Sequence, residues 1–144
     1  MQNSNRYHCQ YLKKDGKFIW PMPEGAKDYK LTEAEVKKLL RWVIKKLNVK
    51  PEEFYSSCRK RELAQARSMI SYMLFSMGVE RRIIAKLLGK ERSSIQNLCY
   101  FAIREWGEEL EPIGGLIYAY ELWRSERADL NLYYQVKRSK RRGK

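Results

Sequence analysis

The side chains best suited to binding a ligand by hydrogen bonds follow residue 92, within and just beyond the segment AKLLGKERSSIQNL (85–98). At helical spacing, hydrogen-bonding side chains gather on one side of this stretch: Ser93, Gln96, Asn97, Tyr100 and Arg104. Amides of Asn and Gln can form paired hydrogen bonds with adenine, arginine can do so with guanine, and hydroxyls can bond bases or phosphate. This side carries no aliphatic residue, so the pattern favours recognition of nucleic acid.

Catalytic and metal-binding patterns are weak by comparison. The carboxylate pairs Glu52-Glu53 and Glu108-Glu109 are chain neighbours, and neighbours on a helix point in different directions. The only histidine, His8, stands next to Cys9, and no second such pair occurs. The three cysteines, Cys9, Cys58 and Cys99, are scattered, which is typical of reduced thiols in a cytoplasmic protein. The sequence therefore predicts no enzyme, no metal site and no cofactor.

The charge of the chain also favours nucleic acid as the ligand. Thirty Lys and Arg against seventeen acids give a net charge of +13, which attracts polyanions. Residues 1–107 hold 22 basic and 11 acidic side chains, residues 108–136 hold 2 and 6, and residues 137–144 hold 6 and none. No apolar run is long enough for a membrane span. We expect a cytoplasmic, nucleoid-associated protein.

The elements that must position the polar side chains are two helices, predicted over 80–88 and 92–106. Ile84 and Leu88 would anchor the first, and Ala85 is small enough for the second helix to cross it. Gly89 suits the left-handed backbone of a tight turn, and Ile95 and Leu98 would anchor the second helix. These spacings predict a helix-turn-helix. The bland alternative is a glycine-capped helical pair with an ordinary solvated side.

The remaining elements are also helical, which predicts an all-α fold. Thr32 and Glu35 form a capping box for a helix to about residue 48, and Pro51 suits the first turn of a short helix. A longer helix is predicted over 62–77 with Gly78 as its cap. The segment EPIGG, 111–115, is expected to break the chain before a last helix over 116–130. We divide the chain into an extended N-terminal arm (1–30), a helix-turn-helix domain (31–107), an acidic helical extension (108–136) and a disordered basic tail (137–144).

Residues 36–104 resemble the C-terminal DNA-binding domain of the bacterial replication initiator DnaA, a fold related to that of the Trp repressor. The order of elements matches, and the start of the long helix, Arg61-Glu-Leu-Ala64-Gln-Ala-Arg67, fits the family's R-x-x-A-x-x-R pattern. The resemblance implies that Arg59, beside Lys60 and Arg61, reaches the minor groove. The family's base-reading signature aligns with Lys90, Glu91, Arg92, Ser93, Ser94 and Ile95.

The departures from this family bear on specificity and activity. Glu91 and Arg92 stand where the family has Asp and His, and Gly89 replaces a pair of glycines, so a base preference of its own is expected. The chain has no G-x-x-x-x-G-K-[ST] loop, so the initiator's ATPase is not expected. The shorter turn also resembles transposase and repressor units.

Taken together, the sequence predicts sequence-specific binding of double-stranded DNA, in transcriptional or replication control, with a phage or mobile element as one setting. The helix over 92–106 would enter the major groove, and Arg67, Arg81, Arg82 and Lys86 would hold phosphates. The alternative is a protein-interaction or RNA-binding helical module. The last helix is the expected surface for a protein partner or a homodimer, and no membrane partner is expected.

Overall fold

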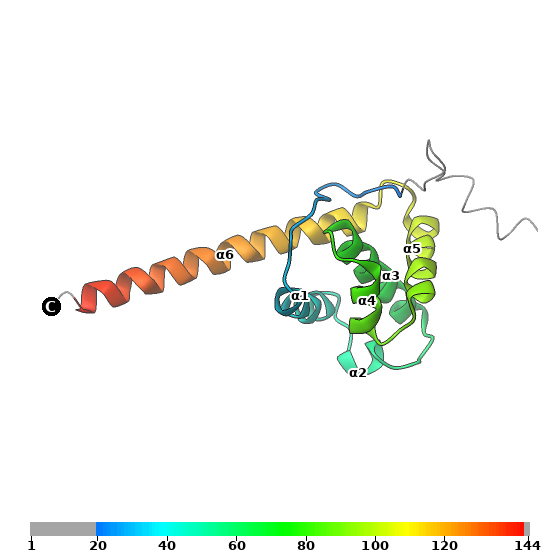
Figure 1. Ribbon diagram of the computed structural model, residues 1–144, viewed down its shortest axis with the longest axis horizontal. Coiled ribbons are helices and arrows are strands. Elements are labelled where there is room, and N and C mark those ends of the chain that lie inside the picture. Colours follow the sequence, from blue (N-terminus) through cyan, green and yellow to red (C-terminus); the bar gives the residue numbers. More distant parts are fainter. Residues whose placement is uncertain (1–19, 143–144) are drawn as a thin grey trace, which may run out of the picture.

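The structure, a computed structural model, describes residues 20–142, with side chains as far as Arg127. This part of the chain is all-α, with six helices and no strand (Figure 1). The helices are α1 (Glu33–Lys46), α2 (Pro51–Phe54), α3 (Arg61–Ser76), α4 (Arg81–Leu88), α5 (Arg92–Trp106) and α6 (Glu111–Arg142). Residues 1–19 of the predicted arm and 143–144 of the predicted tail lie outside the described residues.

The predicted signals at the helix ends are confirmed. Thr32 Oγ1 accepts a hydrogen bond from the Glu35 amide at 3.2 Å, and Glu35 Oε1 accepts one from the Thr32 amide at 2.9 Å. This reciprocal pair satisfies two amides that the first turn of α1 leaves without helical partners. Pro51 stands in the first turn of α2, and Gly78 follows α3 with a φ of +93°.

The central helix of the core is α3, which packs against α1, α2, α4, α5 and α6. Six apolar residues of α3 and its C-terminal cap are buried, and they are Leu63, Ala66, Ile70, Met73, Leu74 and Met77. Apolar residues of α1, α4 and α5 complete one continuous core around them. Burial of this apolar surface is what holds the short helices together, because helices of this length are marginal in isolation.

The described part of the arm, residues 20–30, runs along the C-terminal end of α3. The amides of Lys27 and Tyr29 donate to the carbonyls of Ser76 and Met77 at 3.1 and 3.0 Å. Gly78 makes this approach feasible, since a Cβ there would lie 2.9 Å from the Asp28 Cα. At the start of the described arm, the Trp20 ring packs against α3 and α5.

The last helix corrects two predictions. EPIGG does not break the chain but forms the first turn and a half of α6, which begins at Glu111 rather than 116. Pro112 is tolerated because first-turn amides have no helical acceptor anyway. Gly114 lies beside the arm, where a Cβ would be 3.4 Å from the Glu24 backbone, which is van der Waals contact. The helix is also longer than the predicted 116–130, because it continues through Arg142.

Candidate nucleic-acid interface

Helices α4 and α5, with the turn between them, form the α4–α5 unit. Gly89 adopts the left-handed conformation predicted for it, with φ 67° and ψ 36°. The Lys90 amide then donates to the Ala85 carbonyl at 2.9 Å, which satisfies an acceptor at the end of α4. Ala85 and Ile95 are buried, as are the other α4 anchors, Ile84 and Leu88. The turn is therefore fixed by backbone hydrogen bonds and by apolar anchors on both helices.

The start of α5 presents polar side chains outward. Arg92, Ser93 and Asn97 are exposed, and Gln96 is half-buried. We call these four residues the outer face of α5. Gln96 Nε2 donates to the Tyr100 hydroxyl at 3.4 Å, a long contact that leaves its carbonyl oxygen uncommitted. This face can offer donors and acceptors to a ligand without any change of the backbone.

Tyr100 does not belong to the outer face, which corrects the prediction. Its side chain is buried, with only 8% of its surface exposed. The Trp20 ring lies 4.9 Å from the Tyr100 ring, and it also meets Tyr72 and Phe75 edge to face. The arm therefore covers this part of α5, and local helical spacing carries no signal of a contact made from such a distance along the chain.

Arg67 is likewise not a phosphate ligand, because it is buried beneath the loop between α2 and α3. Its guanidinium donates to four carbonyls, those of Glu53, Phe54, Ser56 and Cys58, at distances of 2.7–3.0 Å. Only 6% of the residue is exposed. A planar group with five donors suits this task, since it can bridge several loop carbonyls from one position. Arg67 holds the basic loop in place from the inside.

The basic residues on that loop and at the start of α3 point outward. Arg59, Lys60 and Arg61 are exposed, as predicted for ligand contacts. Arg61 forms a 2.7 Å ion pair with Glu105 on α5. Hydrogen bonding from Gln65 and the charge of Arg61 lower the pKa of Glu105. The ion pair ties the start of α3 to the C-terminal end of α5.

The basic loop and the outer face therefore lie toward opposite ends of α5. Arg92 begins the helix and Glu105 is one residue from its end. At 1.5 Å per residue these positions are about 20 Å apart along the axis. A ligand that contacts both must be extended, as a duplex is.

The residues predicted to hold phosphates have partners of their own. Arg82 pairs with Glu80 at 2.7 Å, Lys86 with Glu33 at 3.2 Å and Lys60 with Glu53 at 3.9 Å. All three pairs are exposed, and such pairs contribute little to stability and exchange readily. These cations can therefore leave their carboxylates for a phosphate.

Arg81 is constrained differently. Its guanidinium lies over the rings of Trp20 and Phe75, at 4.7 and 4.8 Å from their centres. The side chain is half-buried, so much of it is already used in packing. It can offer an edge to a ligand but not the whole guanidinium.

The sixteen predicted site residues thus fall into three groups by exposure. The exposed ones are Arg59, Lys60, Arg61, Arg82, Lys86, Glu91, Arg92, Ser93, Asn97 and Arg104. The half-buried ones are Arg81, Lys90, Ser94 and Gln96, and the buried ones are Arg67 and Tyr100. Within the described part of the chain, Arg59, Lys90 and Arg92 form no ion pair with a carboxylate.

The sequence did not predict a second basic surface between α1 and α6. This groove of about 380 Å³ is lined by Lys38, Arg41, Trp42, Lys45, Trp123 and Arg127. The rings of Trp42 and Trp123 stack at 5.5 Å, and Arg127 covers Trp123 at 4.9 Å. The basic residues of α1 were visible off its apolar stripe, but only the packing of α6 places Trp123 and Arg127 beside them.

Among residues 20–127, no cluster of side chains could hold a metal ion. Burial raises the pKa of the Cys99 thiol to about 12, so it stays protonated and unreactive. None of the helices in the described part is long and apolar enough to cross a membrane. Comparison of the chain with family models, with curated proteins and with solved structures finds no match.

Proposed function

We propose that the chain binds double-stranded DNA in a sequence-specific manner, with the α4–α5 unit acting as a helix-turn-helix. The observation that carries this proposal is the outer face of α5. Its polar side chains stand on a helix whose opposite side is anchored by Ile95 and whose start is oriented by the Gly89 turn. A helix presented in this way fits the major groove, where Asn, Gln and Arg can distinguish bases.

The contacts divide into two kinds in this proposal. Arg92, Gln96 and Asn97 contact base edges, while Ser93 and Lys90 bond to bases or phosphates nearby. Arg82, Lys86 and the basic loop contact the backbone, after exchanging their carboxylate partners for phosphates. Because the loop lies about 20 Å along α5 from Arg92, it would contact a neighbouring stretch of the duplex.

The resemblance to the DNA-binding domain of DnaA supports the same arrangement. This resemblance implies that the loop from Arg59 to Arg61 reaches a minor groove and that the residues from Lys90 to Ser94 read bases. Glu91 and Arg92 differ from the family's signature, so we propose a target different from the initiator's recognition box. The proposed role is control of transcription or replication, including that of a phage or mobile element.

The experiment is selection of bound duplexes from a random pool, followed by titration of the selected duplex with purified variants. Asn97→Ala should reduce the preference for the selected over a scrambled duplex by about tenfold, because a paired base contact is worth roughly 1–3 kcal/mol. Lys86→Ala should weaken both duplexes alike and make the salt dependence less steep.

A matched control is available for the lysine. Lys27 is exposed like Lys86 and pairs with Glu121 at 3.7 Å, but it lies on the arm beside α6. Lys27→Ala should leave duplex affinity nearly unchanged. If single-stranded RNA of equal length displaces the selected duplex, or if neither Asn97→Ala nor Lys86→Ala affects binding, the chain is an RNA-binding or protein-interaction module instead.

A further inference from the structure

Helix α6 has two opposite sides with different surroundings. Leu116, Tyr120 and Trp123 face the body of the protein, where they are buried or packed against the core. Tyr118 and Leu122, on the other side, are 65% and 49% exposed. On the side of α6 that faces away from the body, Tyr118 and Leu122 are therefore two large apolar residues without a partner in the described structure.

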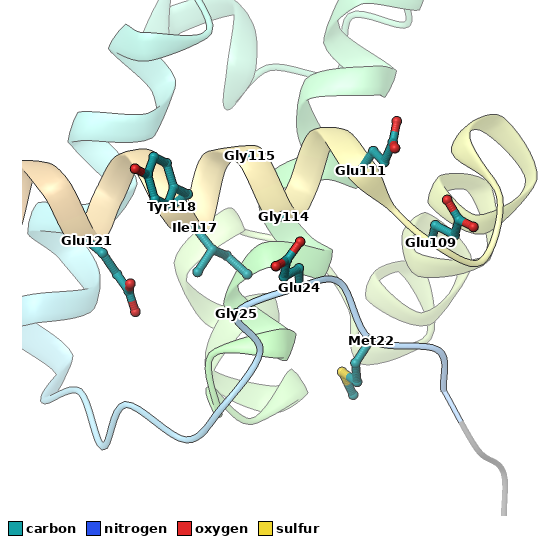
Figure 2. A pocket seen from close by; sticks show the side chains of 10 residues that line it. All are labelled: Met22, Glu24, Gly25, Glu109, Glu111, Gly114, Gly115, Ile117, Tyr118 and Glu121. Atoms are coloured by element: carbon teal, nitrogen blue, oxygen red, sulfur yellow. The ribbon is translucent and has the colours of Figure 1, made fainter.

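An acidic groove adjoins this exposed side, between the arm and the first turns of α6 (Figure 2). It has a volume of about 700 Å³ and is lined by four glutamates, Glu24, Glu109, Glu111 and Glu121, and by no Lys or Arg. Glu121 bonds to the Tyr29 hydroxyl and pairs with Lys27. The other three have no ion pair among the described residues, although the chain carries a net charge of +13.

The chain itself contains a segment of the complementary charge, at the other end of the same helix. Residues 137–142 contain five Lys or Arg and no acid. In a helix these residues lie more than about 30 Å along the axis from Gly115, which lines the groove. Figure 1 shows α6 as one continuous helix that extends away from the body, so its end cannot turn back to its own groove. Only another molecule can bring this segment there.

The helical register of α6, counted along its backbone and sequence, permits such an encounter between two copies. Starting at Tyr118 and Leu122, alternating steps of three and four lead to Ser125, Asp129, Leu132 and Val136. The steps from Tyr118 to Val136 are four, three, four, three and four residues, the same from either end. Two identical helices in antiparallel orientation can therefore place these positions opposite one another. Tyr118 then corresponds to Val136 of the second copy, Leu122 to Leu132, and Ser125 to Asp129.

We propose that a second copy of this chain docks on the exposed side of α6, with the two helices antiparallel and related by a two-fold axis. The basic residues 137–142 of each copy then run along the acidic groove of the other. Parallel pairing would place acid against acid and base against base, and is disfavoured by charge. The inference depends only on α6 and the arm, not on DNA binding.

The mass of the purified chain in solution tests the pairing. We expect about twice 17.3 kDa by analytical ultracentrifugation in a micromolar concentration series. Leu122→Asp should weaken the dimer by about tenfold or more, because it places a charge in the apolar seam. Tyr55→Asp is the matched control, since Tyr55 is 47% exposed but lies beside α2. It should leave the mass unchanged. A monomeric wild-type chain, or equal effects of the two variants, would overturn the proposal.

Disulfide trapping tests the orientation. Leu122→Cys and Leu132→Cys are introduced separately into a chain whose Cys9 and Cys58 are replaced by serine; the buried Cys99 is retained. Antiparallel pairing predicts rapid cross-linking when the two variants are mixed and slow cross-linking of either alone. Faster cross-linking of the Leu122→Cys variant alone would show parallel helices and overturn the arrangement. Circular dichroism checks that every variant remains folded.

Discussion

Arginines that are packed inside the fold and arginines that are exposed on its surface serve opposite purposes in this protein. We call these two settings the inner side and the outer side. On the inner side, Arg67 donates to two carbonyls at the end of α2 and to two carbonyls of the loop that follows, and Arg81 stacks on the rings of Trp20 and Phe75. On the outer side, Arg59 and Arg92 are exposed and form no ion pair among the described residues. Substitutions should therefore affect stability on the inner side and ligand affinity on the outer side.

The largest effect is expected for Arg67→Ala. Two carbonyls of α2 and two of the loop would lose a charged donor, and the free energy of unfolding should fall by about 3 kcal/mol. Urea denaturation followed by circular dichroism measures this, and Arg67→Lys, which keeps the charge but not the planar fork, should recover only part of the loss. An Arg67→Ala chain with wild-type stability but weaker duplex binding would place Arg67 on the outer side after all.

The turn glycines extend the comparison to the backbone. Gly78 faces the arm, and Gly78→Ala combines a φ of +93° with a Cβ only 2.9 Å from the Asp28 Cα. Gly89 faces open space, where no heavy atom lies within 4 Å of the position that a Cβ would take, so Gly89→Ala meets only the cost of a φ of +67°.

We expect Gly78→Ala to lower the free energy of unfolding by about 2 kcal/mol and Gly89→Ala by about 1 kcal/mol. Thermal unfolding of the two variants side by side gives this order. The reverse order would mean that the arm does not pack on the end of α3 as described.

A smaller difference in stability is expected between the alanine variants of Arg81 and Arg92. Arg81→Ala removes two ring contacts and should cost about 1 kcal/mol of stability. Arg92→Ala, at an exposed position, should change stability by less than about 0.5 kcal/mol but weaken binding of a selected duplex. Denaturation and fluorescence anisotropy on the same preparations supply both values. Equal losses of stability would remove the distinction between the two sides.

The smallest effect concerns the half-buried carboxylate of Glu105, which joins α5 to the start of α3 through Arg61. The pKa of Glu105 is lowered by the Gln65 hydrogen bond and by Arg61, so its ionised form favours the folded state. This contribution is present above the ordinary pKa of the group and is lost as the pH falls through the lowered value. Glu105→Gln should therefore be less stable than wild type at pH 7, and this difference should disappear as the pH falls through the lowered pKa of Glu105. A difference in urea midpoint that persists in acid would indicate a packing role instead.

Local signals in the sequence predicted the elements around the candidate site well. The capping box at Thr32, the left-handed Gly89 and the buried anchors Ala85 and Ile95 were all confirmed. Each depends on residues a few positions apart, so its physical cause lies within one element or one turn.

The errors arose where distant segments meet. Tyr100 has the spacing of an exposed residue but is covered by Trp20, and Gly114, in the segment expected to break the chain, lies within α6 beside the arm. Arg67 matched a family pattern, and its helical position alone could not show that four carbonyls lie around it. Predictions from spacing fail at these positions because spacing does not include the partner across the interface.

The burial of Arg67 has a consequence for how this surface could be altered. Because Arg67 fastens the loop through main-chain carbonyls, the exposed side chains of Arg59 and Lys60 take no part in these hydrogen bonds. Arg59 and Lys60 can then be exchanged for other residues while the loop keeps its shape. Mutation or design that aims to change the ligand preference of the protein can therefore begin with the exposed residues of this loop without unfolding the protein.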